Sequence, residues 1–406
     1  MIGFGQGWEK TFGINGDSNG KSVQQTIDGG YIVCGYLNTF SGNSSDIYLI
    51  KTDENGIEEW SHSYGGTDSE RGYSVQQTSD GGYIVCGGTI DLSLIKTDVN
   101  GIEQWSQTFG GVGIDRGYSV QQTNDGGYIV CGTTNSFSNG SANIYLIKTD
   151  GNGVEQWSQI FGGMSNDYGR SVKQTNDGGF IIIGVTESFA NLIHNAYLIK
   201  TDSNGVEEWS QIYGDTASFG SSVQQTADGG YIISGDYYDI DNSQTDLYLI
   251  KTDAFGQEQW SQTIGDISRD EDGNSVNKTT DGGYIIVGSK IDDYFVSTSY
   301  LYLVKTNDNG LEQWSQTFGT GSERGFSVQQ TTDGGFIVTG ESSSNLYLVK
   351  TDANGNVTST FNIPINPKRK LQKTIDFLGR ESKPQKNVPF TEIYDDGTVE
   401  KKITID

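Results

Sequence analysis

Carboxylates and tyrosines, side chains well suited to binding a ligand, gather in three neighbouring stretches of the chain. Carboxylate oxygens are the ligands that Ca²⁺ prefers, and tyrosine rings beside carboxylates can hold a sugar by stacking and hydrogen bonding. We predict a ligand-binding set in the first and last stretches, made up of Asp236, Tyr237, Tyr238, Asp239, Asp241, Asp292, Asp293 and Tyr294. We predict that the stretch between them binds Ca²⁺ through Asp270, Glu271 and Asp272. The alternative is a set of acidic loops that only faces water.

Catalytic chemistry has weaker support in the sequence. A serine or cysteine nucleophile needs a nearby histidine, and the sequence has His62 in a repeated strand and His194 in a loop. A pair of carboxylates could act on glycosides, but no spacing among the many Asp and Glu residues singles out an acid and a base. We therefore name no catalytic residue, and a carboxylate-dependent carbohydrate-active enzyme is the alternative to a binding protein.

These stretches belong to a sequence that repeats about every 50 residues, a period that indicates a solenoid or a propeller. Each repeat contains Asp-Gly-Gly followed by Tyr or Phe. The seven copies begin at Asp28, Asp80, Asp125, Asp177, Asp228, Asp281 and Asp333. All seven tryptophans of the chain occupy one position of the repeat, namely Trp8, Trp60, Trp105, Trp157, Trp209, Trp260 and Trp314.

Each repeat predicts four short strands, which we call a, b, c and d. In the second copy they cover residues 72–78, 83–87, 92–97 and 102–109. Strands b and c are rich in aromatic and β-branched residues, which favour strands. The a–b and c–d turns contain Asp-Gly or Asn-Gly, which tolerate the positive φ that tight hairpins require.

The strand order predicts an all-β fold, a seven-bladed β-propeller of four-stranded antiparallel blades. Radial closure leaves only short strand edges, whereas the alternative, an open solenoid, exposes long ones. Residues 7–12 form a d-type strand with no a, b or c before it, while the segment after the last repeat, 355–362, lacks the tryptophan of a true d strand. We therefore predict that the N-terminal strand completes the last blade, and that the propeller covers residues 1–360.

The repeated tryptophans and the cysteines are predicted to serve the scaffold. A tryptophan copied into every blade is expected to pack between neighbouring blades, with an aromatic binding platform as the alternative. Cys34, Cys86 and Cys131 share one position of strand b in three consecutive repeats. Equivalent points on neighbouring blades are too far apart for the Cα spacing of about 6 Å that a disulfide needs, so we expect packing residues.

The strand order places the b–c and d–a connections on one rim, the loop rim, and the two hairpin turns on the other, the turn rim. The hairpin turns hardly change between repeats, whereas the b–c loops range from residues 88–91 to the longer 236–241 and 289–295. Variable loops on a rigid frame commonly carry binding, so we expect the ligand at the loop rim. Near the channel mouth, Arg71, Arg116 and Arg324 each follow an acidic residue; they either bind an anion or form surface ion pairs worth about 0–1 kcal/mol each.

Net charge and hydropathy exclude two classes of function. The formal charge of −26 would repel a phosphate backbone, so we expect no nucleic-acid partner. No apolar run reaches about 18 residues, so we expect no transmembrane segment. Residues 1–8 show no basic region followed by an apolar stretch, so no signal peptide is visible.

The repeat resembles those of secreted bacterial β-propeller proteins of undefined activity. The likeness rests on the order DGGYIVCG, YLIKTD, NG and EQWSQTFGG. The segment from Thr97 to Trp105 is also similar to the tryptophan-docking motif of quinoprotein propellers, although it is one residue shorter between Asp and Gly, and nothing supports a quinone cofactor. The resemblance implies the propeller fold and leaves the ligand open.

All four prolines lie after residue 360, in a tail that carries a charge of +2 and leaves −28 for the repeats. Residues 361–406 resemble the C-terminal sorting domain of the bacterial type IX secretion system. The likeness rests on Asn366-Pro367, on residues 375–380 (IDFLGR), on the hairpin turn at 394–397 and on residues 400–403 (EKKI), although the segment is short for such a domain. It implies that the secretion machinery recognises the tail and that the protein is secreted or held at the cell surface; the alternative is a β-hairpin folded against the propeller.

Together these features predict an exported, non-enzymatic propeller that binds a glycan or a protein through its loop rim, with Ca²⁺ as the cofactor considered. We expect a monomer. A purely structural module is a third alternative.

Overall fold

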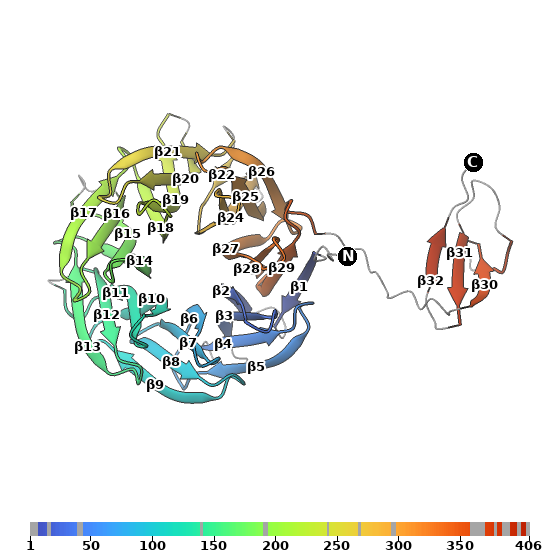
Figure 1. Ribbon diagram of the computed structural model, residues 1–406, viewed down its shortest axis with the longest axis horizontal. Coiled ribbons are helices and arrows are strands. Elements are labelled where there is room, and N and C mark those ends of the chain that lie inside the picture. The colour runs from blue at the N-terminus through green and yellow to red at the C-terminus, as the bar shows by residue number, and fades with distance from the viewer. Residues whose placement is uncertain are drawn as a thin grey trace. The chain divides into compact units, whose positions relative to one another are not determined.

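The computed structural model describes residues 7–13, 18–38, 44–138, 141–189, 194–241, 243–266, 269–293, 298–357, 370–376, 380–383, 390–395 and 399–402. The chain divides into two compact units, Met1–Thr358 and Ser359–Asp406 (Figure 1). None of the described segments forms a helix long and apolar enough to cross a membrane.

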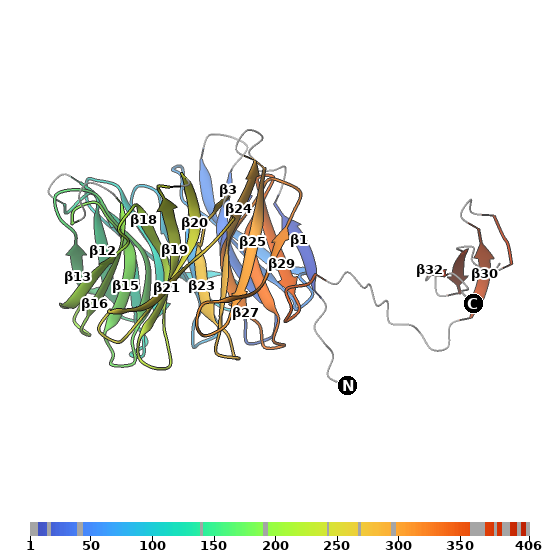
Figure 2. The ribbon, with the colours of Figure 1, turned by 90° about the horizontal axis from the view of Figure 1, so that it is seen from above.

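The first unit is a seven-bladed β-propeller, with the strands of each blade running between the two rims (Figure 2). Blade 1 contains β2 (Ser18–Gln25), β3 (Tyr31–Asn38), β4 (Ser45–Thr52) and β5 (Glu58–Tyr64). Blade 2 contains β6 (Gly72–Gln77), β7 (Tyr83–Gly88), β8 (Leu92–Thr97) and β9 (Glu103–Phe109). Blade 3 contains β10 (Asp115–Gln122), β11 (Tyr128–Thr134), β12 (Asn143–Thr149) and β13 (Glu155–Phe161). Blade 4 contains β14 (Asp167–Gln174), β15 (Phe180–Thr186), β16 (Asn195–Thr201) and β17 (Glu207–Tyr213).

The remaining three blades follow the same order. Blade 5 contains β18 (Ser218–Gln225), β19 (Tyr231–Asp239), β20 (Gln244–Thr252) and β21 (Glu258–Ile264). Blade 6 contains β22 (Asp270–Glu271), β23 (Ser275–Lys278), β24 (Tyr284–Asp293), β25 (Thr298–Thr306) and β26 (Glu312–Phe318), with its innermost strand split in two. Blade 7 contains β27 (Glu323–Gln330), β28 (Phe336–Ser342), β29 (Asn345–Thr351) and β1 (Trp8–Phe12). The predicted fold class is therefore confirmed.

The N-terminal strand closes the ring, as predicted. β1 pairs antiparallel with β29, from Trp8 opposite Lys350 to Phe12 opposite Leu346 (Figure 1). The last blade thus combines the first and last strands of the repeat region.

The repeated tryptophans pack between blades. A Cβ added to Gly101 of blade 2, where φ is +77°, would lie 2.6 Å from the Trp60 ring of blade 1. Trp60 also lies 5.8 Å from the Tyr83 ring of blade 2, measured between ring centroids. The same contacts recur around the ring, so the tryptophan explains both the turn glycine and the aromatic residue after Asp-Gly-Gly.

The turn rim is held by a repeated ion pair. Lys148 of strand c is 5% exposed, and its Nζ lies 2.9 Å from the Asp125 carboxylate of the Asp-Gly-Gly turn. Burial alone would raise the pKa of Asp125, but hydrogen bonds from Thr123, Lys148 and the Gly127 N–H, and the charge of Lys148, outweigh it and lower the pKa to about 2. Equivalent pairs occur in all seven blades: Lys51–Asp28, Lys96–Asp80, Lys148–Asp125, Lys200–Asp177, Lys251–Asp228, Lys305–Asp281 and Lys350–Asp333.

Side chains of the innermost strands join neighbouring blades. The Gln24 amide oxygen accepts a hydrogen bond from the Gln77 backbone N–H at 2.6 Å, and the Ser22 hydroxyl accepts one from the Val75 N–H at 3.2 Å. Because these bonds satisfy backbone donors that face the next blade, the repeated Ser-Val-Gln-Gln sequence belongs to the frame.

The three cysteines are buried and free, in agreement with the prediction of packing residues. Cys131 explains a glycine of the next blade, because a Cβ at Gly169 would lie 2.5 Å from its Sγ.

The second unit is a three-stranded antiparallel sheet of β30 (Leu371–Ile375), β31 (Phe390–Tyr394) and β32 (Val399–Lys402). Asp376 and Arg380, two residues of the predicted strand-and-turn signature at 375–380, form an ion pair at 2.9 Å. Of the sorting-domain likeness, Asn366, Pro367 and residues 377–379, 396–397 and 403 lie outside the described residues. The sheet shows that the tail contains more than one hairpin.

Candidate functional site

A bulge in each innermost strand turns one side chain into the central channel. In blade 3, Gly117 pairs with Gly132 and Ser119 pairs with Cys131, so that Tyr118 has no partner in the ladder. Such bulges re-aim side chains and are frequent beside binding sites. Six blades share this register shift, and in blade 6 the strand break between β22 and β23 takes its place. The residues at this position are Lys21, Tyr73, Tyr118, Arg170, Ser221, Asn274 and Phe326.

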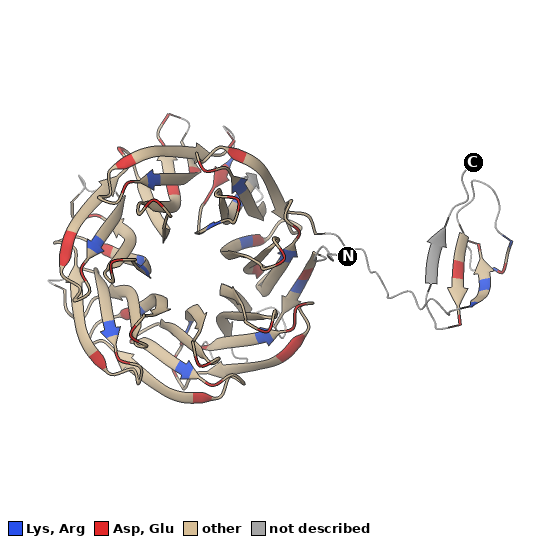
Figure 3. Cartoon of the chain, viewed as in Figure 1, with Lys and Arg blue, Asp and Glu red and all other residues tan. Residues whose placement is uncertain are grey.

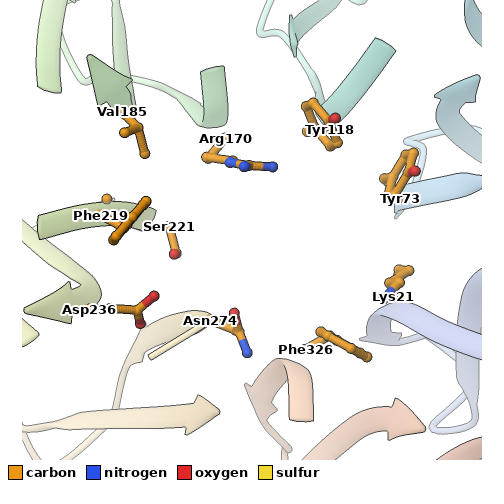
Figure 4. Close-up of a pocket in the computed structure, with 11 residues that line it drawn as sticks. Lys21, Tyr73, Tyr118, Arg170, Val185, Phe219, Ser221, Asp236, Asn274 and Phe326 are labelled. Atoms are coloured by element: carbon orange, nitrogen blue, oxygen red, sulfur yellow. The ribbon is translucent and has the colours of Figure 1, made fainter. Parts of the chain in front are cut away.

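These seven side chains surround a cavity of about 340 Å³ in the channel, which we call the mouth (Figure 4). Val185, Phe219 and Asp236 complete its wall. The mouth lies at the loop-rim end of the channel, where the innermost strands begin and the b strands end. A second cavity of about 330 Å³, the waist, lies between the glutamine-bearing parts of the same strands.

The glycine that precedes each bulge residue is required by close packing. A Cβ at Gly220 would lie 2.5 Å from the Ile183 side chain of the preceding blade, and one at Gly325 would lie 2.4 Å from Val287. Packing between blades therefore requires glycine at this position, whereas the type of the next residue can vary.

Three cations lie over aromatic rings in the mouth or beside it. Lys21 Nζ lies 3.4 Å from the Phe326 ring centroid, and the Arg71 guanidinium carbon lies 4.7 Å from that of Tyr36. Arg170 lies 5.1 Å from the ring of Tyr118. Such contacts contribute about 0.5–1 kcal/mol at exposed sites. Burial lowers the pKa of Lys21 to about 8; the charge of Glu341 opposes this shift, and those of Arg71 and Arg324 add to it.

Two carboxylates meet at the blade 5 and blade 6 side of the mouth. Asp236 accepts a hydrogen bond from the Gly273 N–H at 2.9 Å, and Asp272 accepts one from the Asn274 amide at 3.0 Å. Burial raises the pKa of Asp236, although the Gly273 bond and the charge of Arg170 oppose it. Burial and then the charge of Asp236 raise the pKa of Asp272. The raised pKa values favour a proton on one of the two carboxylates. Ionisable groups with shifted pKa values are frequent in functional sites.

The ligand set predicted in blade 5 separates in the structure. Asp236 faces the mouth, whereas Tyr237 packs 5.2 Å from the Tyr248 ring and donates a hydrogen bond to Asp215 at 2.8 Å. Tyr238 is 38% exposed, and Asp239 accepts a hydrogen bond from the Asp241 N–H at 2.8 Å. Most of this stretch is strand rather than the expected loop, because β19 and β20 pair as far as Asp239 and Gln244.

In blade 6 the backbone of Asp292 and Asp293 belongs to β24, and Tyr294 lies outside the described residues. The strands of this hairpin also continue into the expected loop, with Asp293 opposite Thr298.

The three residues predicted to bind Ca²⁺ take different positions. Asp270 accepts a hydrogen bond from the Thr245 N–H at 2.9 Å, Glu271 pairs with Lys290 at 3.0 Å, and Asp272 joins Asp236. Within the ranges that the structure describes, no three histidine, cysteine or acidic side chains lie close enough together to share a metal ion. The Ca²⁺ site stays a prediction.

Within the described residues, the expected surface ion pairs are not formed by Arg71, Arg116 and Arg324. Their acidic neighbours bind the backbone instead: Asp115 accepts from the Gly111 N–H at 3.1 Å, and Glu323 accepts from the N–H groups of residues 320–322 at 2.8–3.0 Å. The contacts of these arginines therefore favour the other prediction, that they bind an anion.

Sequence reasoning missed most of the mouth, including Lys21, Tyr73, Tyr118, Arg170, Asn274 and Phe326. A signal was present, because one position between the constant glycine and the Ser-Val pair changes type in almost every repeat. Variation within a constant segment marks a side chain that the frame does not use.

Fold and site together define this chain as a seven-bladed β-propeller with an open, chemically diverse channel mouth. Among solved structures, it is similar to the WD40 domain of Pan2 from Neurospora crassa, with a TM-score of 0.50 and 10% identity over 85% of this chain and 98% of that one. A protein of unknown function from Bacteroides caccae aligns with a TM-score of 0.43 and 12% identity over 70% of this chain and 94% of that one. No protein-family model and no curated protein matches the sequence. At this identity the likeness to the WD40 domain shows the fold alone.

Proposed function

We propose that this chain is an exported, non-enzymatic β-propeller that binds a glycan at the loop-rim mouth of its channel. The observation that carries the proposal is the convergence of non-repeated aromatic, cationic and carboxylate side chains on one cavity of about 340 Å³. This volume lies within the range of about 300–1,000 Å³ typical of small-ligand pockets. Rings beside hydrogen-bonding groups suit a sugar, which has both apolar faces and hydroxyl groups.

Two tyrosines, on blades 2 and 3, form an aromatic pair in the wall of the mouth. The ring centroids of Tyr73 and Tyr118 lie 4.9 Å apart at an angle of 56°, so that the pair offers both a ring face and a ring edge. Export is supported by the likeness of the tail to a sorting domain, which predicts recognition by the secretion machinery.

The test is a glycan-array screen of the intact chain and of the Tyr118→Ser variant. Serine is the residue that blade 5 has at this position, as Ser221, so the frame is expected to fold. We expect binding of the intact chain and a loss of at least tenfold in the variant. Tyr238→Ala, at the loop rim outside the mouth, is the matched control and should bind normally.

A loss of binding with Tyr238→Ala but not with Tyr118→Ser would move the site to the originally predicted loops. No binding to any glycan would favour a protein partner or a structural role.

A carbohydrate-active enzyme is the second candidate, because Asp236 and Asp272 form a carboxylate pair with raised pKa values. In a glycosidase one such group donates a proton while the other acts as base or nucleophile. Turnover of a bound glycan that Asp272→Asn abolishes would establish this candidate; binding without turnover would exclude it for that glycan.

A further inference from the structure

The cations of the propeller are concentrated on the channel wall. The repeat region has 17 lysines and arginines, seven of which form the Lys–Asp pairs of the turn rim. Of the ten others, seven lie on the innermost strands: Lys21, Arg71, Arg116, Arg170, Lys173, Lys278 and Arg324. Arg71 alone immediately precedes its strand, at the start of β6. The outermost strands are instead acidic, with Glu residues at the start of each d strand from β5 to β26 (Figure 3).

Three of these cations lie at one side of the loop-rim end of the channel, where Lys21 lines the mouth. Lys21 of blade 1 lies close enough to Arg71 of blade 2 and Arg324 of blade 7 for their charges to act on its pKa. We call these three residues the cationic corner. Tyr36 and Phe326 separate the cations, with Lys21 Nζ lying 5.9 Å from the Tyr36 ring centroid and 3.4 Å from that of Phe326.

The cationic corner contacts uncharged aromatic side chains, since Lys21 and Arg71 lie over the Tyr36 ring and Lys21 lies over that of Phe326. Within the described residues, none of its three side chains forms an ion pair, in contrast to the lysines of the turn rim. One carboxylate, Glu341, acts on Lys21 and raises its pKa, and it also accepts a hydrogen bond from the Asn19 amide. Like charges held close to one another are unfavourable, and an anion that binds between them removes this repulsion.

The other carboxylates of the mouth compensate the corner poorly. Asp236 and Asp272 stand on blades 5 and 6. The charge of Arg324 acts on Asp272 and opposes the rise of its pKa, but burial keeps the pKa values of both carboxylates raised, which reduces the negative charge that they carry near neutral pH. The mouth therefore has an excess of positive charge inside a protein whose repeat region carries −28.

We infer that the ligand of the mouth is an anionic sugar whose carboxylate or sulfate group lies at the cationic corner. This inference rests on the proposed function, and it assigns the charged group of the ligand to Lys21, Arg71 and Arg324. Arginine presents a planar fork that matches such oxyanions, and the lysine supplies a point charge. The acidic exterior repels the same ligand, so that binding elsewhere on the propeller is disfavoured.

Substitutions that the repeat itself uses provide the test. Lys21→Ser copies Ser221 of blade 5, and Arg71→Asn copies Asn19 of blade 1. Lys10→Ser removes the same unit of charge from the exposed outer strand β1 and is the matched control. Circular dichroism and the melting temperature establish that each variant is folded.

Calorimetric titrations of the intact chain would use a galacturonic acid oligosaccharide, the neutral galactose oligosaccharide of the same length, a sulfated oligosaccharide and inorganic sulfate. We expect an acidic oligosaccharide to bind at least tenfold more tightly than the neutral one, since charge-assisted hydrogen bonds are about twice as strong as neutral ones. Lys21→Ser and Arg71→Asn should each weaken this binding about tenfold, and Lys10→Ser should leave it within about twofold. A higher salt concentration should weaken it because the charges are accessible to solvent.

The outcomes separate this inference from the proposed function. Equal binding of the neutral and acidic sugars, or unchanged binding in Lys21→Ser, would overturn the anionic inference and leave the glycan site standing. Binding of inorganic sulfate that depends on Lys21, without binding of any sugar, would overturn the proposed function while supporting the anionic corner. No binding of any of the four probes would overturn both.

Discussion

The two ends of the channel differ in how they use charge. At the turn rim every buried lysine has a carboxylate at 2.8–3.0 Å, and the same residues recur in all seven blades. At the loop-rim mouth the cations lie over aromatic rings without ion pairs in the described residues, and nearly every blade contributes a different side chain. At the turn rim the charged groups pair with one another, whereas at the mouth the cations are available to a ligand.

This difference follows from the geometry of the repeat. Every hairpin turn must close its hairpin and pack against the next blade. The same residue types are therefore found in the turns of all seven blades. The bulge residue is skipped in the ladder of its own blade, so its type is free to serve a ligand. Substitutions should therefore affect stability at the frame and binding at the mouth.

The largest effect is expected for Trp157→Ala, which removes a contact between blade 3 and blade 4. Trp157 lies 5.8 Å from the Phe180 ring and against Gly205. Because the ring is only partly buried, we expect a loss of about 3 kcal/mol, at the low end for a tryptophan in a core. Urea denaturation would measure it, with Tyr118→Ser as the comparison at below about 1 kcal/mol. Equal losses of unfolding free energy in the two variants would contradict the view that the tryptophans stabilise the fold and that the mouth residues do not.

A smaller effect of opposite sign is expected for Asp236→Asn. The native state raises the pKa of Asp236 above that of the unfolded chain, so the carboxylate costs stability increasingly as the pH rises from the unfolded pKa through the native pKa. The amide cannot ionise, and it retains an oxygen for the Gly273 N–H. We expect a gain of about 1 kcal/mol near pH 8 that vanishes near pH 4. Thermal unfolding across this range would check it, and a gain independent of pH would contradict the electrostatic explanation.

The smallest effect is expected for Asp125→Asn at the turn rim. The lowered pKa of Asp125 stabilises the native state above the unfolded pKa of about 4, and this contribution disappears as the pH falls towards about 2. The carboxylate is 57% exposed, so the contribution of one pair should be at most about 1 kcal/mol. The variant should lose less stability than the intact chain between these pH values when melting temperatures are compared. A parallel decrease in both proteins would show that the pair does not contribute.

The blades and their order could be predicted from the sequence, because each structural residue has the same local role in all seven repeats. Asp-Gly-Gly marks a turn, the tryptophan marks an outer strand, and an unmatched strand at residues 7–12 finds its place in blade 7. The mouth could not be predicted in the same way. Tyr118, Lys21 and Asp272 are far apart in sequence, and they meet only because ring closure brings equivalent positions together.

The expected loop at residues 236–241 illustrates the limit of reading variability alone. Its composition suggested an exposed ligand loop, but tertiary pairing extended β19 as far as Asp239 and turned alternate side chains to opposite faces. Asp236 and Tyr237 are neighbours in sequence yet act in different places for this reason.

Closure of blade 7 by β1 also sets an order of events during synthesis. Residues 8–12 leave the ribosome before the other strands of the propeller, but their partner strand, Asn345–Thr351, follows only after more than 300 further residues. At roughly 5–20 residues per second, the first strand waits about 15–70 s for its partner. During that interval the growing chain is an incomplete ring whose edge strands are unpaired, and the mouth has its full set of side chains only when the two ends of the propeller meet.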